Sequence, residues 1–172
     1  EYTFEGKTIY LDSDIDLIGH EWESIGGEPY IKYYLLNRNK CFSGVFDGQN
    51  HTIKNLTSSY ANNNYNALFG FVKDGTIKNV GITDACVTIN TNSKFKNSGF
   101  GILADRVEDS FIIHSYTTGS ITNSSEYAYY LGGLVGECTG GSKVIGCYST
   151  AKVISKVLEY KVVYNAFGGT VG

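Results

Sequence analysis

The feature that most constrains this fold is an internal repeat, because a fixed period predicts copies of one structural unit stacked along one axis. Four segments share a pattern of small, apolar, apolar and small residues. They begin roughly 34 residues apart, a period typical of solenoids and arrays. The four segments are Ala67-Leu68-Phe69-Gly70, Gly101-Ile102-Leu103-Ala104, Gly133-Leu134-Val135-Gly136 and Gly169-Thr170-Val171-Gly172.

A second series follows the first three copies after a short turn. It comprises TIKNVGI at 76–82, FIIHSYT at 111–117 and KVIGCYS at 143–149, which aligns Ile77 with Ile112 and Val144. An earlier copy of the same series is expected at TIKNLT, residues 52–57, because the tetrapeptide TIKN occurs at 52–55 and again at 76–79. Two matched series with nearly the same period indicate a true repeat.

The repeating unit reads as short strands and turns. The chain has 21 Gly and 14 Tyr, and its 3.6-residue periodicity is too weak for a helical hairpin. A propeller blade needs four strands in about 40–50 residues, whereas each period here holds two clear strands and a polar loop. We therefore expect one all-β module over residues 1–172, a parallel β-helix of about four to five coils. The stretch 154–164 is expected to be strand and loop.

The glycines of LGGLVG, residues 131–136, need an explanation, because glycine in a strand costs about 0.5–1 kcal/mol relative to alanine. In stacked coils the chain must turn at the same place in every copy. Glycine allows positive φ there and lets neighbouring backbones approach closely. We expect the glycines to mark these corners, while Leu134 and Val135 fill the interior.

Charge and apolar content exclude several partners. The net charge is −3, and the chain has no basic patch of the kind that binds nucleic acid. No apolar run approaches the roughly 20 residues of a membrane span. The first residue is Glu1 rather than Met, so the chain is expected to be part of a longer protein. The four cysteines lack CxxC spacing and are expected to be mostly packed thiols, with a Cys138–Cys147 disulfide left open.

Several of these strings resemble one bacterial repeat family. LGGLVG followed by GCYSTAKV resembles the GLUG repeat, named for its glycine–leucine–hydrophobic–glycine core, although Ala104 stands where the final glycine of one copy is usual. The opening coils of such domains are similar to DIDLIG at 14–19, EWESIG at 21–26, FSGVFDGQNHTIKNLT at 42–57 and ALFGFVKDGTIKNVGI at 67–82.

The resemblance covers most of the chain and implies a right-handed β-helix in a large secreted or cell-surface bacterial protein. Similar segments lie beside the peptidase unit of IgA-cleaving metalloproteases and in adhesin-like proteins. The resemblance is specific for architecture and says little about activity.

Two acidic strings near the start of the chain are candidate metal sites. HEWES at 20–24 lacks the second histidine of a zinc HExxH helix, since Ser24 takes its place. We expect Trp22 and Ile25 to pack inward, and His20 and Glu21 to face solvent. DSDID at 12–16 lacks the glycine and distal glutamate of a calcium loop, and is expected to be a charged edge strand that discourages aggregation. No metal site is predicted.

The densest charge cluster, Asp105, Arg106, Glu108 and Asp109, is the candidate for intrinsic catalysis. Parallel β-helices host polysaccharide lyases and hydrolases, and hydrolysis needs two carboxylates that face one groove. No equivalent cluster occurs one coil away, so we expect these residues to form a solvated turn between two strands. No catalytic residue and no cofactor are predicted. His114 takes the repeat position of Asn79 and is expected to line a turn.

Exposed tyrosines in asparagine-rich loops, such as YANNNYN at 60–66, favour ligand binding, because tyrosine gives amphipathic contact area at low entropic cost. The alternative, that these rings cover coil edges, stays open. The candidate ligand-binding residues are Tyr60, Asn63, Tyr65, Tyr127, Tyr129 and Tyr130.

The function expected from these observations is a non-catalytic structural or adhesive module, extracellular or on the bacterial cell surface. Its partners would be neighbouring domains of the same polypeptide and a host glycan or protein. The alternative is an accessory region of a larger secreted protease or glycan-degrading enzyme whose catalytic unit lies elsewhere. An intrinsic lyase or hydrolase is the third hypothesis.

Overall fold

A computed structural model describes residues 3–27, 40–59, 65–90, 99–124, 130–155, 166–168 and 170. These residues form short strands and turns with almost no helix, and their strands associate in four sheets. All of the strand pairs in the described part of the chain are parallel. The predicted all-β class is confirmed, and so is the predicted parallel pairing.

The two larger sheets carry most of the strands. Sheet A has the order β1 (Thr8–Tyr10), β3 (Val45–Asp47), β7 (Thr76–Lys78), β11 (Phe111–Ile113) and β15 (Lys143–Ile145). Sheet B has the order β2 (Ile15–Asp16), β4 (Thr52–Lys54), β8 (Gly81–Ile89), β12 (Tyr116–Asn123) and β16 (Tyr148–Ser149). In addition, β5 (Thr57–Ser58) pairs with β8, and β17 (Lys152–Ser155) pairs with β12.

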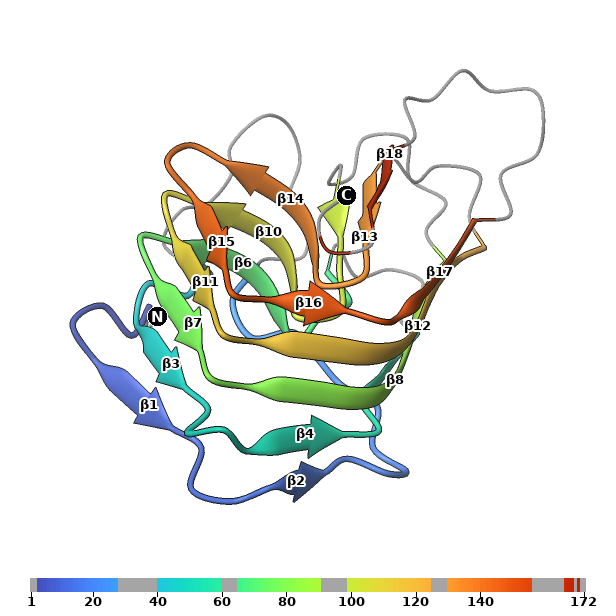
Figure 1. Cartoon of the computed structure of the whole chain (residues 1–172), viewed down its shortest axis with the longest axis horizontal. Coiled ribbons are helices and arrows are strands. Elements are labelled where there is room, and N and C mark those ends of the chain that lie inside the picture. The colour runs from blue at the N-terminus through green and yellow to red at the C-terminus, as the bar shows by residue number, and fades with distance from the viewer. Residues whose placement is uncertain are drawn as a thin grey trace.

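Two smaller sheets complete the arrangement. Sheet C contains β6 (Phe69–Lys73), β10 (Ala104–Glu108) and β14 (Val135–Thr139). Sheet D contains β9 (Gly99–Phe100), β13 (Tyr130–Gly132) and β18 (Ala166–Gly168). Along the chain, β6 to β9 visit sheets C, A, B and D in turn. The strands β10 to β13 repeat this order, and β14 to β18 repeat it again. In Figure 1 the strands of sheet A lie side by side in rank order from blue β1 to orange β15.

The second repeat series has the predicted register. Ile77 pairs with Ile112, and Ile112 pairs with Val144, as the sequence alignment requires. Ile77 and Ile112 are fully buried. Residues in register across neighbouring strands form a row. Because successive side chains of a strand point to opposite faces, one apolar residue at the same position of each copy is enough to define the inward row.

The two TIKN tetrapeptides are not copies in the same row, and this part of the prediction is wrong. Thr76–Lys78 forms β7 in sheet A and pairs with Val45–Asp47. Thr52–Lys54 forms β4 in sheet B and pairs with Gly81–Thr83 instead. The true neighbour of the second TIKN is therefore Val-Phe-Asp, whose sequence is different but whose middle residue, Phe46, is equally apolar.

The first repeat series is shifted by one residue in its middle copy. Ala104 pairs with Phe69 and with Val135, which are the third residues of their segments rather than the final glycines. The carbonyl of Leu134 accepts hydrogen bonds from both Leu103 N, at 2.9 Å, and Ala104 N, at 3.3 Å. The position in register with Gly70 and Gly136 is that of Asp105, which lies between the paired residues Ala104 and Arg106, so Ala104 is not a replacement for the usual glycine.

The glycines of this series are required by close approach, and the positive φ expected of them is not present. Gly70, Gly101 and Gly136 all have φ outside the left-handed region. A Cβ on Gly136 would overlap the backbone of Phe100, and one on Gly101 would overlap the carbonyl of Ala104. Leu134 and Val135 are fully buried, as expected.

The left-handed corners lie elsewhere, after the strands of sheet A. Asn79 has φ 54°, His114 has φ 44° and Gly146 has φ 61°, each directly after β7, β11 or β15. Asparagine tolerates this conformation better than most residues, and glycine adopts it without strain. The predicted turn-lining role of His114 is confirmed, and its ring lies against Gly146.

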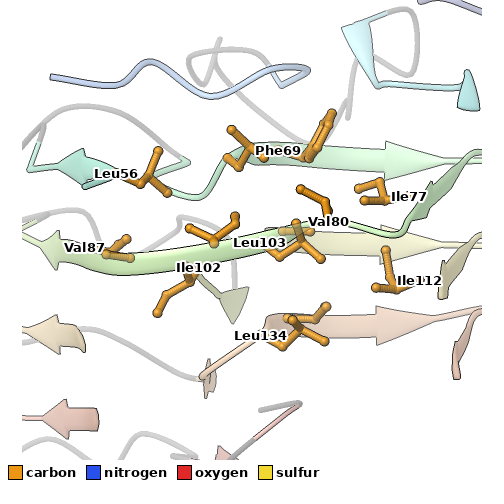
Figure 2. Packing of buried hydrophobic residues seen from close by; sticks show 14 of the residues in the cluster. Leu56, Phe69, Ile77, Val80, Val87, Ile102, Leu103, Ile112 and Leu134 are labelled. Carbon is orange, nitrogen blue, oxygen red and sulfur yellow. The ribbon is translucent and has the colours of Figure 1, made fainter. Parts of the chain in front are cut away.

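The core runs along the inside of the stacked strands. Figure 2 shows Leu56, Phe69, Ile77 and Leu134 among the side chains that meet there. We call each visit of the chain to sheets C, A, B and D one pass. The core side chains of the last described pass are less buried, since Val144, Cys147 and Val153 are only partly buried against the core. The strand Lys152–Ser155 agrees with the strand expected at the start of 154–164, and the rest of that stretch lies outside the described residues.

Candidate functional site

The predicted ligand-binding residues fall mostly outside the described residues, where Tyr60, Asn63, Tyr127 and Tyr129 lie. Tyr130 is half-buried at the start of β13 and pairs with Gly99 and Ala166.

The expectation that Tyr65 is exposed is wrong. Its side chain is 8% exposed and packs with Cys41 and Phe71. The ring covers Gly27 and Gly70, neither of which has room for a Cβ beside it. Tyr65 therefore fills a local apolar cluster, and its ring is not offered to a ligand.

The HEWES segment anchors to the first repeat copy. The indole Nε1 of Trp22 donates to Leu68 O at 3.1 Å, and Ser24 Oγ donates to Ala67 O at 2.7 Å. Trp22 and Ile25 pack against the core, whereas His20 and Glu21 are exposed, as expected. No group of three or more His, Cys, Asp or Glu side chains within the described ranges could hold a metal ion.

The DSDID segment has an ordered structural role. Its β2 is the outermost described strand of sheet B, which confirms the predicted edge. Asp14 Oδ1 accepts from Thr52 N at 2.8 Å, and that hydrogen bond lowers the pKa of Asp14. Asp16 Oδ1 accepts from Asn55 Nδ2 at 2.7 Å, which likewise lowers the pKa of Asp16. These carboxylates hold the next pass of the chain in addition to charging the edge.

The charge cluster at 105–109 is not a solvated turn, and this prediction is wrong. Asp105, Arg106 and Glu108 lie within β10, and only Asp109 follows it. Asp105 is fully buried, whereas Arg106 and Glu108 face outward on the other side of the strand. Two acids on opposite faces of one strand cannot act on one sugar across a common groove.

Asp105 is a buried carboxyl that fixes two backbone segments. Its Oδ2 accepts from Asn66 N at 2.6 Å and from Ala67 N at 3.1 Å, and its Oδ1 accepts from Gly101 N at 2.9 Å. Burial raises the pKa of Asp105 to about 7, against the three N–H donors that favour the charged form. The residue links the small–apolar–apolar–small segments of two successive passes.

The outward side chains of β10 form an ion-pair network. Glu108 binds Lys73 Nζ at 2.7 Å through Oε1 and Arg106 Nη2 at 3.1 Å through Oε2. The guanidinium of Arg106 lies 5.3 Å from the ring centroid of Phe71, and its Nε is 3.9 Å from Glu137 Oε2. Both oxygens of Glu108 are thus directed to cations, which fits a structural cross-brace between β6, β10 and β14.

An exposed aromatic row is the surface feature that sequence reasoning missed. The rings of Tyr116 and Tyr148 stack with centroids 5.1 Å apart and planes 4° apart. Tyr116 lies over Gly81, and Tyr148 is 53% exposed. Phe111 and Ile145 are exposed in sheet A. Alternation from the inward Ile112 and Val144 would have revealed Phe111 and Ile145 as outward apolar residues.

The four cysteines are thiols, with no disulfide between Cys138 and Cys147. Cys41 is buried, but Cys86 is exposed, so packing explains only part of the set. Burial raises the pKa of Cys138 to about 11, with help from Glu137, and burial also raises the pKa of Cys147. In the part of the chain that the structure describes, no helix has the length and apolarity needed to cross a membrane.

Comparison with known proteins gives one distant likeness. No protein-family model matches the sequence, and no curated protein matches it. Among solved structures, the chain is similar to one provisionally named an immunoglobulin A1 protease, from Bacteroides ovatus. The match covers 98% of this chain and 78% of that chain, at 18% sequence identity and a TM-score of 0.35.

Proposed function

We propose that this chain is a non-catalytic module of a secreted or cell-surface bacterial protein, built as a right-handed parallel β-helix of the GLUG-repeat type. Its role is to space or present neighbouring domains of the same polypeptide. The observation that carries the proposal is the stacking of successive passes in parallel register, illustrated by Ile77, Ile112 and Val144. Such stacking gives a stiff body whose length grows with the number of passes.

The chemistry of the described residues supports a structural role. Each acid that the sequence suggested for catalysis has a bonding role in the fold. Asp105 accepts three backbone hydrogen bonds in the interior, and Glu108 is held by Lys73 and Arg106. Groups that are already saturated in this way are poorly suited to proton transfer, since a general acid or base must reach the reacting atom.

An adhesive role is the second part of the proposal. The exposed rings of Tyr148 and Phe111 offer aromatic surface of the kind that binds a glycan or a protein, in addition to the tyrosine-rich loops. The partner would be a host glycan or a host protein, and the setting would be extracellular.

The test is a pair of assays on the full 172-residue chain. Incubation with panels of polysaccharides and peptides should give no cleavage, and a glycan array should identify a ligand whose binding falls in a Tyr148→Ala variant. Cleavage that is lost in Glu108→Gln would overturn the non-catalytic proposal. A blank array together with no binding to host proteins would remove the adhesive part and leave the spacer.

A further inference from the structure

One buried carboxyl closes two segments of the chain at once. Asp105 is fully buried in β10, and its two oxygens accept three backbone N–H groups. Oδ2 accepts from Asn66 at 2.6 Å and from Ala67 at 3.1 Å, in the segment that leads into β6. Oδ1 accepts from Gly101 at 2.9 Å, in the segment that leads into β10. A single side chain therefore holds both segments against sheet C.

Asp105 is the one side chain in its row of the described strands. The positions in register with it are Gly70 of β6 and Gly136 of β14, on either side of β10. A Cβ on Gly70 would overlap the carbonyl of Gly26, and one on Gly136 would overlap the backbone of Phe100. At the two glycines backbone packs directly on backbone, whereas at Asp105 the contact depends on an ionisable group.

The charged side chains of the strands around Asp105 face outward and pair with one another. Those of β6, β10 and β14 in this outward ion-pair network are Lys73, Arg106, Glu108 and Glu137. The other ionisable groups on the adjoining segments are Glu23, which is exposed, and Tyr65, which packs with Phe71. Burial raises the pKa of Asp105 to about 7, although the three N–H donors oppose the shift. The closed segments thus hold a proton that a hydrated aspartate, with an ordinary pKa of 3.8, releases.

We propose that Asp105 is a pH-sensitive latch, which keeps Asn66, Ala67 and Gly101 closed in acid and lets them open together more often toward neutral pH. Opening brings the carboxyl into water, where it ionises at a lower pH than in the closed form. Closure from this group is therefore fully present below about pH 4 and is lost as the pH rises to about 7. Across that window opening becomes up to about tenfold more frequent per pH unit, and it levels off above about pH 7.

The latch also controls whether a tyrosine side chain is accessible. Tyr65 directly precedes Asn66, and its ring is 8% exposed because it packs with Cys41 and Phe71. Opening at Asn66 withdraws the ring from this cluster. A tyrosine that is buried in acid is then presented at the surface toward neutral pH, and Cys41 loses part of its cover.

Amide hydrogen exchange on the full 172-residue chain, corrected for the intrinsic exchange rate at each pH, tests the latch. Protection of the three amides bound to Asp105 should fall by about tenfold or more between pH 5 and pH 7. It should also stay below the protection of Asn79 and His114, which donate to carbonyls in sheet A, because the latch opens without unfolding the stack. Protection that does not change with pH, or that equals the protection of Asn79 and His114, would overturn the latch.

Two variants assign the pH dependence to one carboxyl. In Asp105→Asn, which removes the titrating group at nearly constant size, the protection of the three amides should no longer change with pH. Asp84→Asn alters an exposed aspartate of β8 and is the matched control, which should keep the wild-type pH dependence. Loss of the pH dependence in Asp84→Asn, or its persistence in Asp105→Asn, would overturn the assignment. If Asp105→Asn does not fold, the wild-type exchange at the two pH values decides alone.

Alkylation of Cys41, followed by peptide mass spectrometry, tests the movement of Tyr65. The rate in the wild type is divided by the rate in Asp105→Asn at the same pH, so that ionisation of the thiol cancels. This ratio should rise several-fold between pH 5.5 and pH 7.5, and a constant ratio would overturn the release of Tyr65. The latch does not depend on the spacer role, so its failure leaves the proposed function standing.

Discussion

The two TIKN tetrapeptides, at 52–55 and 76–79, are the same four residues in two different sheets. In both, the isoleucine points into the core, with Ile53 at 4% and Ile77 at 0% exposure. In both, the asparagine that follows the strand is left-handed, with φ 57° at Asn55 and 54° at Asn79. Identical sequence therefore produces the same local turn without placing the segments in the same row.

The asparagines of the two copies also bind the same kind of partner, an aspartate of the preceding pass. Asn55 Nδ2 donates to Asp16 Oδ1 at 2.7 Å, and Asn79 Nδ2 donates to Asp47 Oδ1 at 3.0 Å. The same oxygen of each aspartate also accepts an N–H from two residues further on, Ile18 or Gln49. TIKN thus encodes a strand, a corner and a hydrogen bond to the preceding pass, and the surroundings decide which corner it forms.

The copies differ in how much structure surrounds them. Ile77 lies between Phe46 and Ile112, and both of their strands are inside sheet A. Ile53 lies between Ile82 and Ile15, and Ile15 is on the outermost described strand of sheet B. The hydrogen bond from Asn55 to Asp16 is exposed, whereas the one from Asn79 to Asp47 is partly buried. We therefore expect each substitution to cost more at 76–79 than at 52–55.

The largest expected difference is in the core. Ile77→Ala should lower the free energy of unfolding by about 4 kcal/mol, because the cavity is enclosed on both sides. Ile53→Ala should cost about 2 kcal/mol, since the edge strand can relax onto the space. Urea unfolding followed by circular dichroism measures both. Equal losses would show that the end of the stack is as rigid as its middle.

The corner asparagines come next. Asn79→Ala should lower the free energy of unfolding by about 2 kcal/mol, because alanine is strained at positive φ and the hydrogen bond to Asp47 is removed. Asn79→Gly should lose only about 1 kcal/mol, since glycine adopts this φ freely, as Gly146 does in the equivalent corner. The substitutions Asn55→Ala and Asn55→Gly should lower the free energy of unfolding by less. An alanine variant as stable as the glycine variant would contradict the left-handed corner.

Asp16 and Asp47, which accept hydrogen bonds from the two asparagines, can be compared by how stability changes in acid. Burial by itself would raise the pKa of Asp47, but the hydrogen bonds from Asn79, Gln49 and Lys78 together lower it. The hydrogen bond from Asn55 lowers the pKa of Asp16. Because a lowered folded pKa stabilises the protein above the unfolded value, both contributions should be lost as pH falls below about 4.

Acid titration of unfolding tests this contribution. Asp47→Asn should flatten the loss of stability in acid more than Asp16→Asn does, because Asp47 accepts from more donors. If both variants retained the full acid dependence of the wild type, neither carboxylate would be acting through its ionised form.

A third carboxyl, Asp105, has the opposite sign. Burial raises the pKa of Asp105 to about 7, so the folded protein holds this proton at pH values where the unfolded chain has released it. Stability from this group is fully present below about pH 4 and is lost as pH rises to about 7. Comparing wild type with Asp105→Asn at pH 5 and pH 7.5 isolates the group. A difference between the two proteins that does not change with pH would contradict the raised pKa.

The sequence predicts what depends on side-chain volume and misses what depends on backbone paths. The Ile77–Ile112–Val144 row was predictable, because each pass needs one apolar residue at that place. TIKN was misplaced, because a corner depends on local φ and one aspartate, and such corners recur in more than one sheet. The one-residue shift at Ala104 was not predictable, because it is a change in strand register, which the small–apolar–apolar–small pattern does not encode.

The candidate site was predicted less well, for related reasons. Asp105 was assigned to a turn because its neighbours are charged, although alternation with Val107 already indicated an inward position. Tyr65 was expected at the surface because it follows an asparagine-rich run, and Gly27, one of the two glycines that make room for its ring, is distant in sequence.

Successive passes of the chain stack in parallel at a defined register. Two hydrogen bonds define it, from Asn79 N to Ile113 O at 3.0 Å and from His114 N to Ile145 O at 2.9 Å. Nuclear magnetic resonance on isotope-labelled protein can detect scalar couplings through such bonds. We expect couplings between these amides and these carbonyls. Couplings of Asn79 or His114 to other carbonyls, or an antiparallel pattern, would contradict it.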